Sequence, residues 1–93
     1  MPKFSLGSLA MTRTVNDTVA HNKQFAMEIT AALHRYALED WGDMCEGDKQ
    51  LNDNAVKTGN DRIVAAYNTE QGKIYIITEW DRSTTLILFA DEY

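Results

Sequence analysis

Two short segments hold the side chains most capable of chemistry. Asp40-Trp41-Gly42-Asp43 places two carboxylates around a glycine, an arrangement that could bind a cation. Glu79-Trp80-Asp81-Arg82-Ser83 combines two carboxylates with a guanidinium, and these groups could serve acid–base chemistry or contact a partner. Exposed polar loops held by a rigid sheet are common binding positions. The candidate partner-binding residues are Asp40, Trp41, Asp43, Glu79, Trp80, Asp81 and Arg82.

Both segments also have a structural interpretation. An EF-hand loop needs oxygen donors at alternating positions, and Cys45 and Gly47 stand where donors would be required. We therefore favour a structural role for the first segment, in which Asp43 caps a helix and Trp41 fills a corner of the domain. In the second segment, Asp81 favours a turn through a hydrogen bond to the backbone. Contact with a partner stays the alternative there.

The other chemistry-bearing residues lack partners at a useful spacing. His34 follows His21 by 13 residues and precedes Cys45 by 11, so no pair has the short spacing of a zinc site. The chain has no glycine-rich phosphate loop, no Gly-x-Ser-x-Gly and no His-Glu-x-x-His sequence. We expect no cofactor, no metal and no catalytic residue, and keep a small carboxylate- or metal-dependent enzyme as an alternative.

Length and composition indicate a folded domain. The 93 residues predict one domain over residues 1–93, and 44% hydrophobic with 25% charged content is ordinary for a globular protein. No stretch approaches the roughly 18 apolar residues of a membrane span, and residues 1–7 lack the apolar segment of a secretory signal. The single cysteine, Cys45, cannot form an internal disulfide. We therefore expect a cytoplasmic protein.

The charge is unevenly distributed along the chain. Residues 1–35 carry four basic and two acidic side chains, a net +2, whereas residues 36–93 carry five and twelve, a net −7. A net-acidic surface repels nucleic acid, unless the first third forms a local basic patch. The acidic excess could attract a basic protein surface, although solubility alone would also explain it.

The last third of the chain predicts a sheet. Arg62–Tyr67, Lys73–Trp80 and Thr84–Phe89 are rich in β-branched and aromatic residues and are separated by turn-forming residues. They predict a three-stranded antiparallel meander. Both faces of the central strand are apolar, so one face should pack on a helix. The N-terminal arm or a second subunit should cover the other face, and we favour the arm while keeping a homodimer as an alternative.

The first two thirds predict helices after an extended start. Phe4–Thr14 is expected to form an irregular strand or arm. Val19–Leu38 has apolar residues at helical spacing, with Asn16 or Asp17 as the cap and His21-Asn22 as the position where the helix could divide. The core residues expected from the helix and the sheet are Ile29, Leu33, Ile76 and Leu88.

A second helix is expected from Met44 to Thr58. Asp43 would cap it, and Gly59 lies where a left-handed C-cap belongs. Its apolar stripe is thin and includes Leu51, so the helix should lie on the surface. The predicted fold class is α+β: an N-terminal strand or arm, two helical segments, then a three-stranded antiparallel meander packed on the long helix.

The chain resembles a family of short proteins from bacterial plasmids and integrative elements, usually described only as plasmid-related. The matching residues are Leu6-Gly7, Thr12-Arg13, His34-Arg35, Asp40-Trp41-Gly42-Asp43, Asp48-Lys49, Asn52, Ala66-Tyr67, Ile77-Thr78-Glu79, Asp81-Arg82-Ser83 and Glu92-Tyr93. Glu39, Ala65 and Trp80 stand where the family has glycine, serine and alanine. The resemblance implies a mobile-element setting and no particular chemistry.

The hypothesis that follows is a small acidic protein-interaction module of a mobile genetic element. Such a module would inhibit or modulate a host defence or nucleic-acid-processing protein. A protein partner is expected, and neither nucleic acid nor a membrane is. The main alternative is a nucleic-acid-binding regulator that uses the basic N-terminal third.

Overall fold

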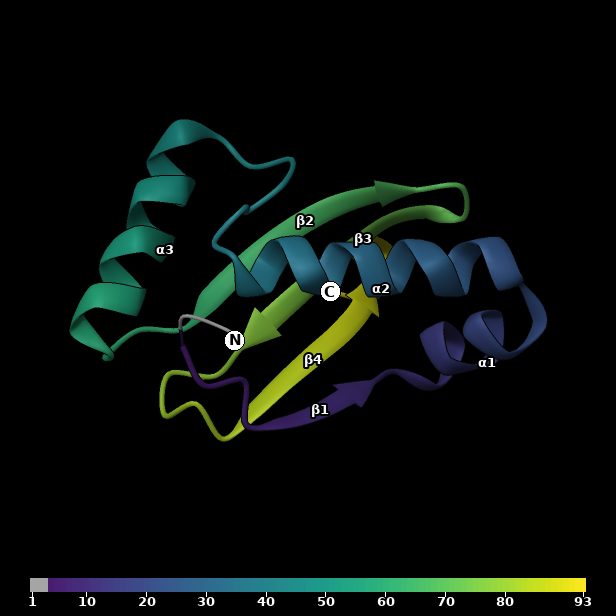
Figure 1. Cartoon of the computed structure of the whole chain (residues 1–93), viewed down its shortest axis with the longest axis horizontal. Coiled ribbons are helices and arrows are strands. Elements are labelled where there is room, and N and C mark those ends of the chain that lie inside the picture. Colours follow the sequence, from purple (N-terminus) through teal and green to yellow (C-terminus); the bar gives the residue numbers. More distant parts are fainter. Residues whose placement is uncertain (1–3) are drawn as a thin grey trace.

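One long helix lies across one face of a four-stranded mixed sheet in the computed structural model, which describes residues 4–93 (Figure 1). The elements in chain order are β1 (Ser8–Met11), α1 (Arg13–His21), α2 (Lys23–Ala37), α3 (Glu46–Thr58), β2 (Ile63–Thr69), β3 (Gly72–Thr78), β4 (Thr84–Phe89) and the 3-10 turn η1 (Ala90–Glu92). The strand order is β1-β4-β3-β2. Strands β2, β3 and β4 are antiparallel neighbours, and β1 is parallel to β4.

The α+β class is confirmed, but the predicted three-stranded sheet is incomplete. The N-terminal arm supplies a fourth strand beside β4, so it does not cover the second face as expected. Upstream of that strand, the Phe4 ring packs edge-on against Tyr36, on the helix side of the sheet. The second face is covered in part by the C-terminal residue, because the Tyr93 ring packs edge-on against Tyr75.

The helical region from residue 13 to residue 37 forms two helices rather than one. Thr12 caps α1, since its Oγ1 accepts a hydrogen bond from the Val15 N–H at 3.3 Å. The predicted start near Asn16 is therefore wrong, because a capping hydroxyl one turn earlier starts the helix. Asn22 caps α2 by accepting from the Phe25 N–H at 2.9 Å. The division falls at the predicted position.

Helix α3 begins two residues later than expected. It follows Cys45, whose side chain makes no capping bond. The predicted cap, Asp43, is wrong because this residue is held at the sheet: its N–H donates to the Ala66 carbonyl at 2.7 Å, and its carboxylate pairs with Lys73. The helix ends as predicted at Gly59, which has a left-handed φ of 74°.

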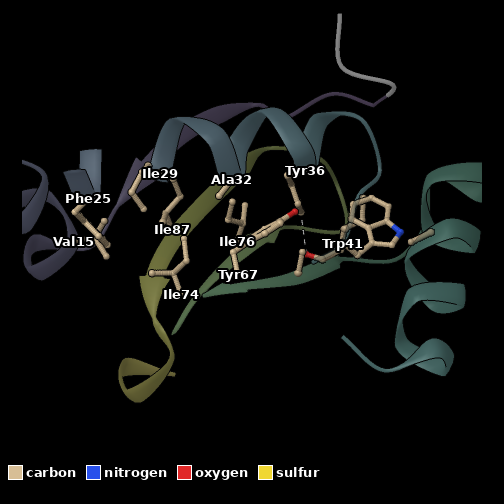
Figure 2. Packing of buried hydrophobic residues seen from close by; sticks show 13 residues of the cluster. Val15, Phe25, Ile29, Ala32, Tyr36, Trp41, Tyr67, Ile74, Ile76 and Ile87 are labelled. Atoms are coloured by element: carbon tan, nitrogen blue, oxygen red, sulfur yellow. Dashed lines mark hydrogen bonds between the residues drawn. The ribbon is translucent and has the colours of Figure 1, made fainter. Parts of the chain in front are cut away.

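The main core lies between α2 and the sheet (Figure 2). Ile29 and Ile76 are buried there as predicted. Leu88 is buried on the opposite face of the sheet, since Ile87 beside it belongs to the main core. Leu33 is only partly buried. The thirteen residues of this core are Val15, Phe25, Ile29, Ala32, Tyr36, Trp41, Ala55, Ile63, Ala65, Tyr67, Ile74, Ile76 and Ile87.

A chain of buried hydroxyl groups crosses this core. The Tyr36 hydroxyl lies 2.7 Å from Thr78 Oγ1, which lies 2.7 Å from Thr85 Oγ1. Thr85 then donates to the Leu6 carbonyl at 2.7 Å. The chain ties α2, β3, β4 and the N-terminal arm together, and burial raises the pKa of Tyr36. Each hydroxyl therefore has a partner where an unpaired one would be costly.

Candidate functional site

The acidic groups of the first segment are held in exposed ion pairs. Asp40 accepts two hydrogen bonds from Arg35, at 2.7 Å from Nε and 3.2 Å from Nη2, and these bonds lower the pKa of Asp40. Asp43 Oδ2 lies 3.0 Å from the Lys73 ammonium, which lowers the pKa of Asp43. The two carboxylates thus have separate cationic partners within the chain. This arrangement anchors the loop, and it does not direct both carboxylates at one bound cation.

The tryptophan and glycine of this segment are structural. Trp41 is 3% exposed, and its Nε1 donates to Asp53 Oδ1 at 2.9 Å. This confirms that Trp41 fills a corner of the core, so its ring is not on the surface. Gly42 has a φ of 72° and pairs with Ala66 of β2. A Cβ at Gly42 would collide with the Ala66 carbonyl oxygen, so glycine is required.

Arg82 is committed to backbone carbonyls. Its Nη1 donates to the carbonyls of Asp61 at 2.7 Å, Glu79 at 3.1 Å and Trp80 at 3.2 Å. Its Nη2 donates to the Ala55 carbonyl at 2.8 Å, in the last turn of α3. The guanidinium therefore joins the β3–β4 loop to the C-terminal end of α3. A positive charge at this end also interacts favourably with the helix dipole.

The remaining residues of the second segment face solvent. Asp81 Oδ1 accepts from the Ser83 N–H at 3.0 Å, which is the predicted turn bond. Hydrogen bonding to the Ser83 side chain, and then to its backbone N–H, lowers the pKa of Asp81. Glu79 is exposed, and Trp80 is 63% exposed. Of the second segment, Glu79, Trp80 and Asp81 are thus placed where a partner could reach them.

The two segments do share one element, which is α3. Trp41 is hydrogen-bonded to Asp53 and Arg82 to Ala55, so both segments bind the C-terminal half of this polar helix. Asn52 adds a third anchor, because its amide group binds the backbone of Val64 in β2. The result is a polar helix fixed against the edge of the sheet by hydrogen bonds in addition to the buried Ala55.

A groove that helical periodicity does not predict lies between α3 and Tyr93. Leu51 was expected in the inward stripe of α3, but it is 66% exposed. The buried residues of α3 are Asn52 and Ala55, and Leu51 lies about 40° beyond Ala55 and about 100° from Asn52 around the helix, at the border of the buried face. The groove has a volume of about 280 Å³ and is lined by Met44, Asp48, Leu51, Asn52, Arg62, Val64 and Tyr93.

Tyr93 also lines this groove and is 64% exposed. Its hydroxyl accepts a hydrogen bond from Arg62 Nη2 at 2.6 Å. Arg62 lies one residue beyond the Ile63–Thr78 pair of β2 and β3, which sets it beside Glu79 at the start of the β3–β4 loop. Arg62 is thus the residue of the groove that lies next in the sheet to the β3–β4 loop.

A different surface carries two of the basic residues of the first third, Lys23 and Arg35. The outward side of α2 has a shallow hollow lined in part by Lys23, Met27, His34 and Arg35. Met27 is 60% exposed, and Arg35 is already paired with Asp40. Lys3, which contributed to the basic count, lies outside the described residues.

Comparison with known proteins finds no relative. A scan against protein-family models, a search of curated proteins and a search of solved structures each gave no match. Within residues 4–93, no cluster of three His, Cys, Asp or Glu side chains is arranged to hold a metal ion. No helix in the same range has the length and apolarity needed to cross a bilayer.

Proposed function

We propose that this chain is an acidic protein-interaction module that binds a basic protein surface through α3 and the segments that flank it. The observation that carries the proposal is the position of Leu51, Trp80 and Tyr93. They are the most exposed large apolar side chains of the described region, at 66%, 63% and 64%. Leu51 and Tyr93 line one groove, and Trp80 lies in the loop that Arg82 joins to α3.

The chemistry of this surface is that of a protein interface. Aromatic and aliphatic anchors surrounded by charged groups are typical of binding hot spots. The groove includes Asp48, and Glu79 and Asp81 are exposed beside Trp80. Together with the net −7 of residues 36–93, these groups favour a basic partner and speed its approach at low salt.

The resemblance to proteins of plasmids and integrative elements supports a particular kind of partner. Proteins that process nucleic acid, including defence nucleases, carry basic surfaces that bind phosphates. An acidic module that occupied such a surface would compete with nucleic acid and so inhibit or modulate the protein. Binding should therefore weaken as the salt concentration rises.

The test is affinity capture from a lysate of the host, with a matched pair of variants. Leu51→Arg places a cation in the groove, whereas Leu38→Arg makes the same change at a position that is 50% exposed at the end of α2. We expect one partner to be retained by the wild type and by Leu38→Arg, lost with Leu51→Arg, released by salt, and competed by DNA or RNA. Absence of a partner, or equal capture by all three proteins, contradicts the proposal.

A nucleic-acid-binding regulator is the second candidate. The observation in its favour is the hollow on α2, which is lined by Lys23, His34 and Arg35. The test is retention of the wild type on a DNA or RNA column at low ionic strength. Salt-dependent retention that Lys23→Glu abolishes and Leu51→Arg leaves unchanged would replace the first proposal with this one.

A further inference from the structure

The two edges of the sheet differ in how their outward backbone hydrogen-bonding groups are covered. Along β2, Gly42 pairs with Ala66, whose N–H and carbonyl bond to the Trp41–Asp43 segment. Asn52 binds both the N–H and the carbonyl of Val64. These contacts occupy the outward backbone N–H and carbonyl groups of Val64 and Ala66, so another strand cannot pair with this part of β2.

Within residues 4–93, the outer edge of β1 carries no such protection. The N–H groups of Ser8 and Thr12 donate inward, to the carbonyl of Ser83 just before β4 at 2.9 Å and to that of Ile87 within β4 at 3.0 Å. Because these groups alternate along a strand, the backbone N–H and carbonyl of Leu9 and Met11 point outward. Figure 1 shows β1 on the outer side of β4. Leu9 is 53% and Met11 37% exposed, and Ser8–Met11 has no charge and no proline.

We propose that this edge pairs with the same edge of a second copy of the chain. An antiparallel pairing with the two-fold axis at Ala10 sets Leu9 opposite the Met11 of the second copy. The outward N–H and carbonyl of each residue then find partners, and the exposed apolar side chains meet. The two four-stranded sheets become one continuous sheet. This inference is independent of the α3 groove.

The charges at the two ends of β1 favour a second copy over an unrelated strand. At the N-terminal end, Gly7 lies against the carbonyls of Arg82 and Ser83, in the loop that carries the exposed Asp81. At the C-terminal end, the exposed Arg13 begins α1. Antiparallel pairing brings Arg13 of each copy toward the Asp81 loop of the other. The strand is short, so the dimer should be weak and concentration-dependent.

The experiment is analytical ultracentrifugation of the full chain up to about 1 mM, with a matched pair of proline variants. Leu9→Pro removes an outward N–H and follows Ser8, which is already extended, so the chain should fold and stay monomeric. Ala10→Pro removes an inward N–H of the β1–β4 ladder, so it should lower the melting temperature. We expect the wild type to dimerise, and circular dichroism will show whether each variant is folded.

The charge pair gives a second and independent measurement. Arg13→Glu and Asp81→Lys should each weaken dimerisation several-fold, and the double variant should restore it. Arg13→Glu should not unfold the chain, because an acidic residue in the first turn suits the helix dipole. A wild type that stays monomeric at about 1 mM overturns the proposal. So does a folded Leu9→Pro variant that dimerises as the wild type does, or a double variant that fails to recover.

Discussion

Asn52 of α3 pairs with Val64 of β2 as a neighbouring strand would. Its Oδ1 accepts from the Val64 N–H at 3.2 Å, and its Nδ2 donates to the Val64 carbonyl at 2.8 Å. The side chain is therefore both an anchor for the helix and a cover for the sheet edge. Since Asn52 is only 5% exposed, water cannot easily replace it.

Asn52→Ala should lower the free energy of unfolding by about 1–3 kcal/mol, because two backbone groups of Val64 lose their partners. Asn54→Ala is the matched control on the exposed side of the same helix, and it should change stability by less than about 0.5 kcal/mol. Urea denaturation measures both. Equal stability of the two variants would show that Asn52 does not hold the helix to the edge.

Arg82 allows its backbone and side-chain contributions to be separated. Arg82→Ala should cost about 1.5–3 kcal/mol, because the guanidinium donates to several carbonyls. Arg82→Gly should cost roughly 1 kcal/mol less, since glycine adopts the observed φ of 61° without strain. Thermal unfolding checks the order of the two variants. If Arg82→Gly is the less stable, the left-handed backbone is not a source of strain.

The buried hydroxyl chain predicts coupling between α2 and the sheet. Tyr36→Phe and Thr78→Val should each cost about 1–3 kcal/mol, because each leaves a buried hydroxyl short of a partner. In the double variant the loss should be smaller than the sum by at least about 0.5 kcal/mol. Chemical denaturation of the four proteins provides the cycle. Simple additivity would mean that the two hydroxyls contribute independently.

The Arg35–Asp40 pair predicts a pH-dependent contribution to stability. The pKa of Asp40 is lowered in the folded chain by its bond to Arg35, so the pair stabilises the fold fully above the ordinary carboxyl pKa of about 4. The contribution is lost as the pH falls through the lower pKa of the folded state. Asp40→Asn should therefore cost up to about 1 kcal/mol at pH 7 and close to nothing near pH 2.

Melting temperatures of the wild type and Asp40→Asn from pH 2 to pH 8 measure this effect. Asp17→Asn is a suitable control, because Asp17 is exposed on α1 and its carboxylate takes part in none of the ion pairs described above. A difference between wild type and Asp40→Asn that stays constant with pH would mean that the ion pair does not act through ionisation of Asp40.

Sequence signals correctly predicted those helix ends, strands and turns that are determined by residues close by in the chain. The run Thr84–Phe89 was predicted with the bounds it has, because β-branched and aromatic residues alternate there between turn residues. Gly59 and Asn22 end and divide helices for reasons that lie within a few residues of each. The turn bond from Ser83 to Asp81 is likewise local.

The predictions that are wrong concern residues whose positions are set by contacts with residues far away in the sequence. Asp43 has the spacing of a helix cap, but the Ala66 carbonyl and Lys73 hold it at the sheet. Leu51 has the type of a core residue, yet the hydrogen bonds of Asn52 to Val64 set the rotation of α3 and leave Leu51 outside. Neither position can be predicted from the residue pattern of a single segment.

The amino-acid order by itself determined the α+β class, the meander, the acidic balance and the turn chemistry of the second segment, because these depend on propensity and on neighbours along the chain. Tertiary structure alone decided that Ser8–Met11 joins β4 in parallel, that Arg82 binds the Ala55 carbonyl of α3, and that Leu51 and Tyr93 line the same groove. These relationships join residues far apart in the chain. Packing and the need to satisfy backbone hydrogen bonds select among many arrangements that the local pattern permits equally.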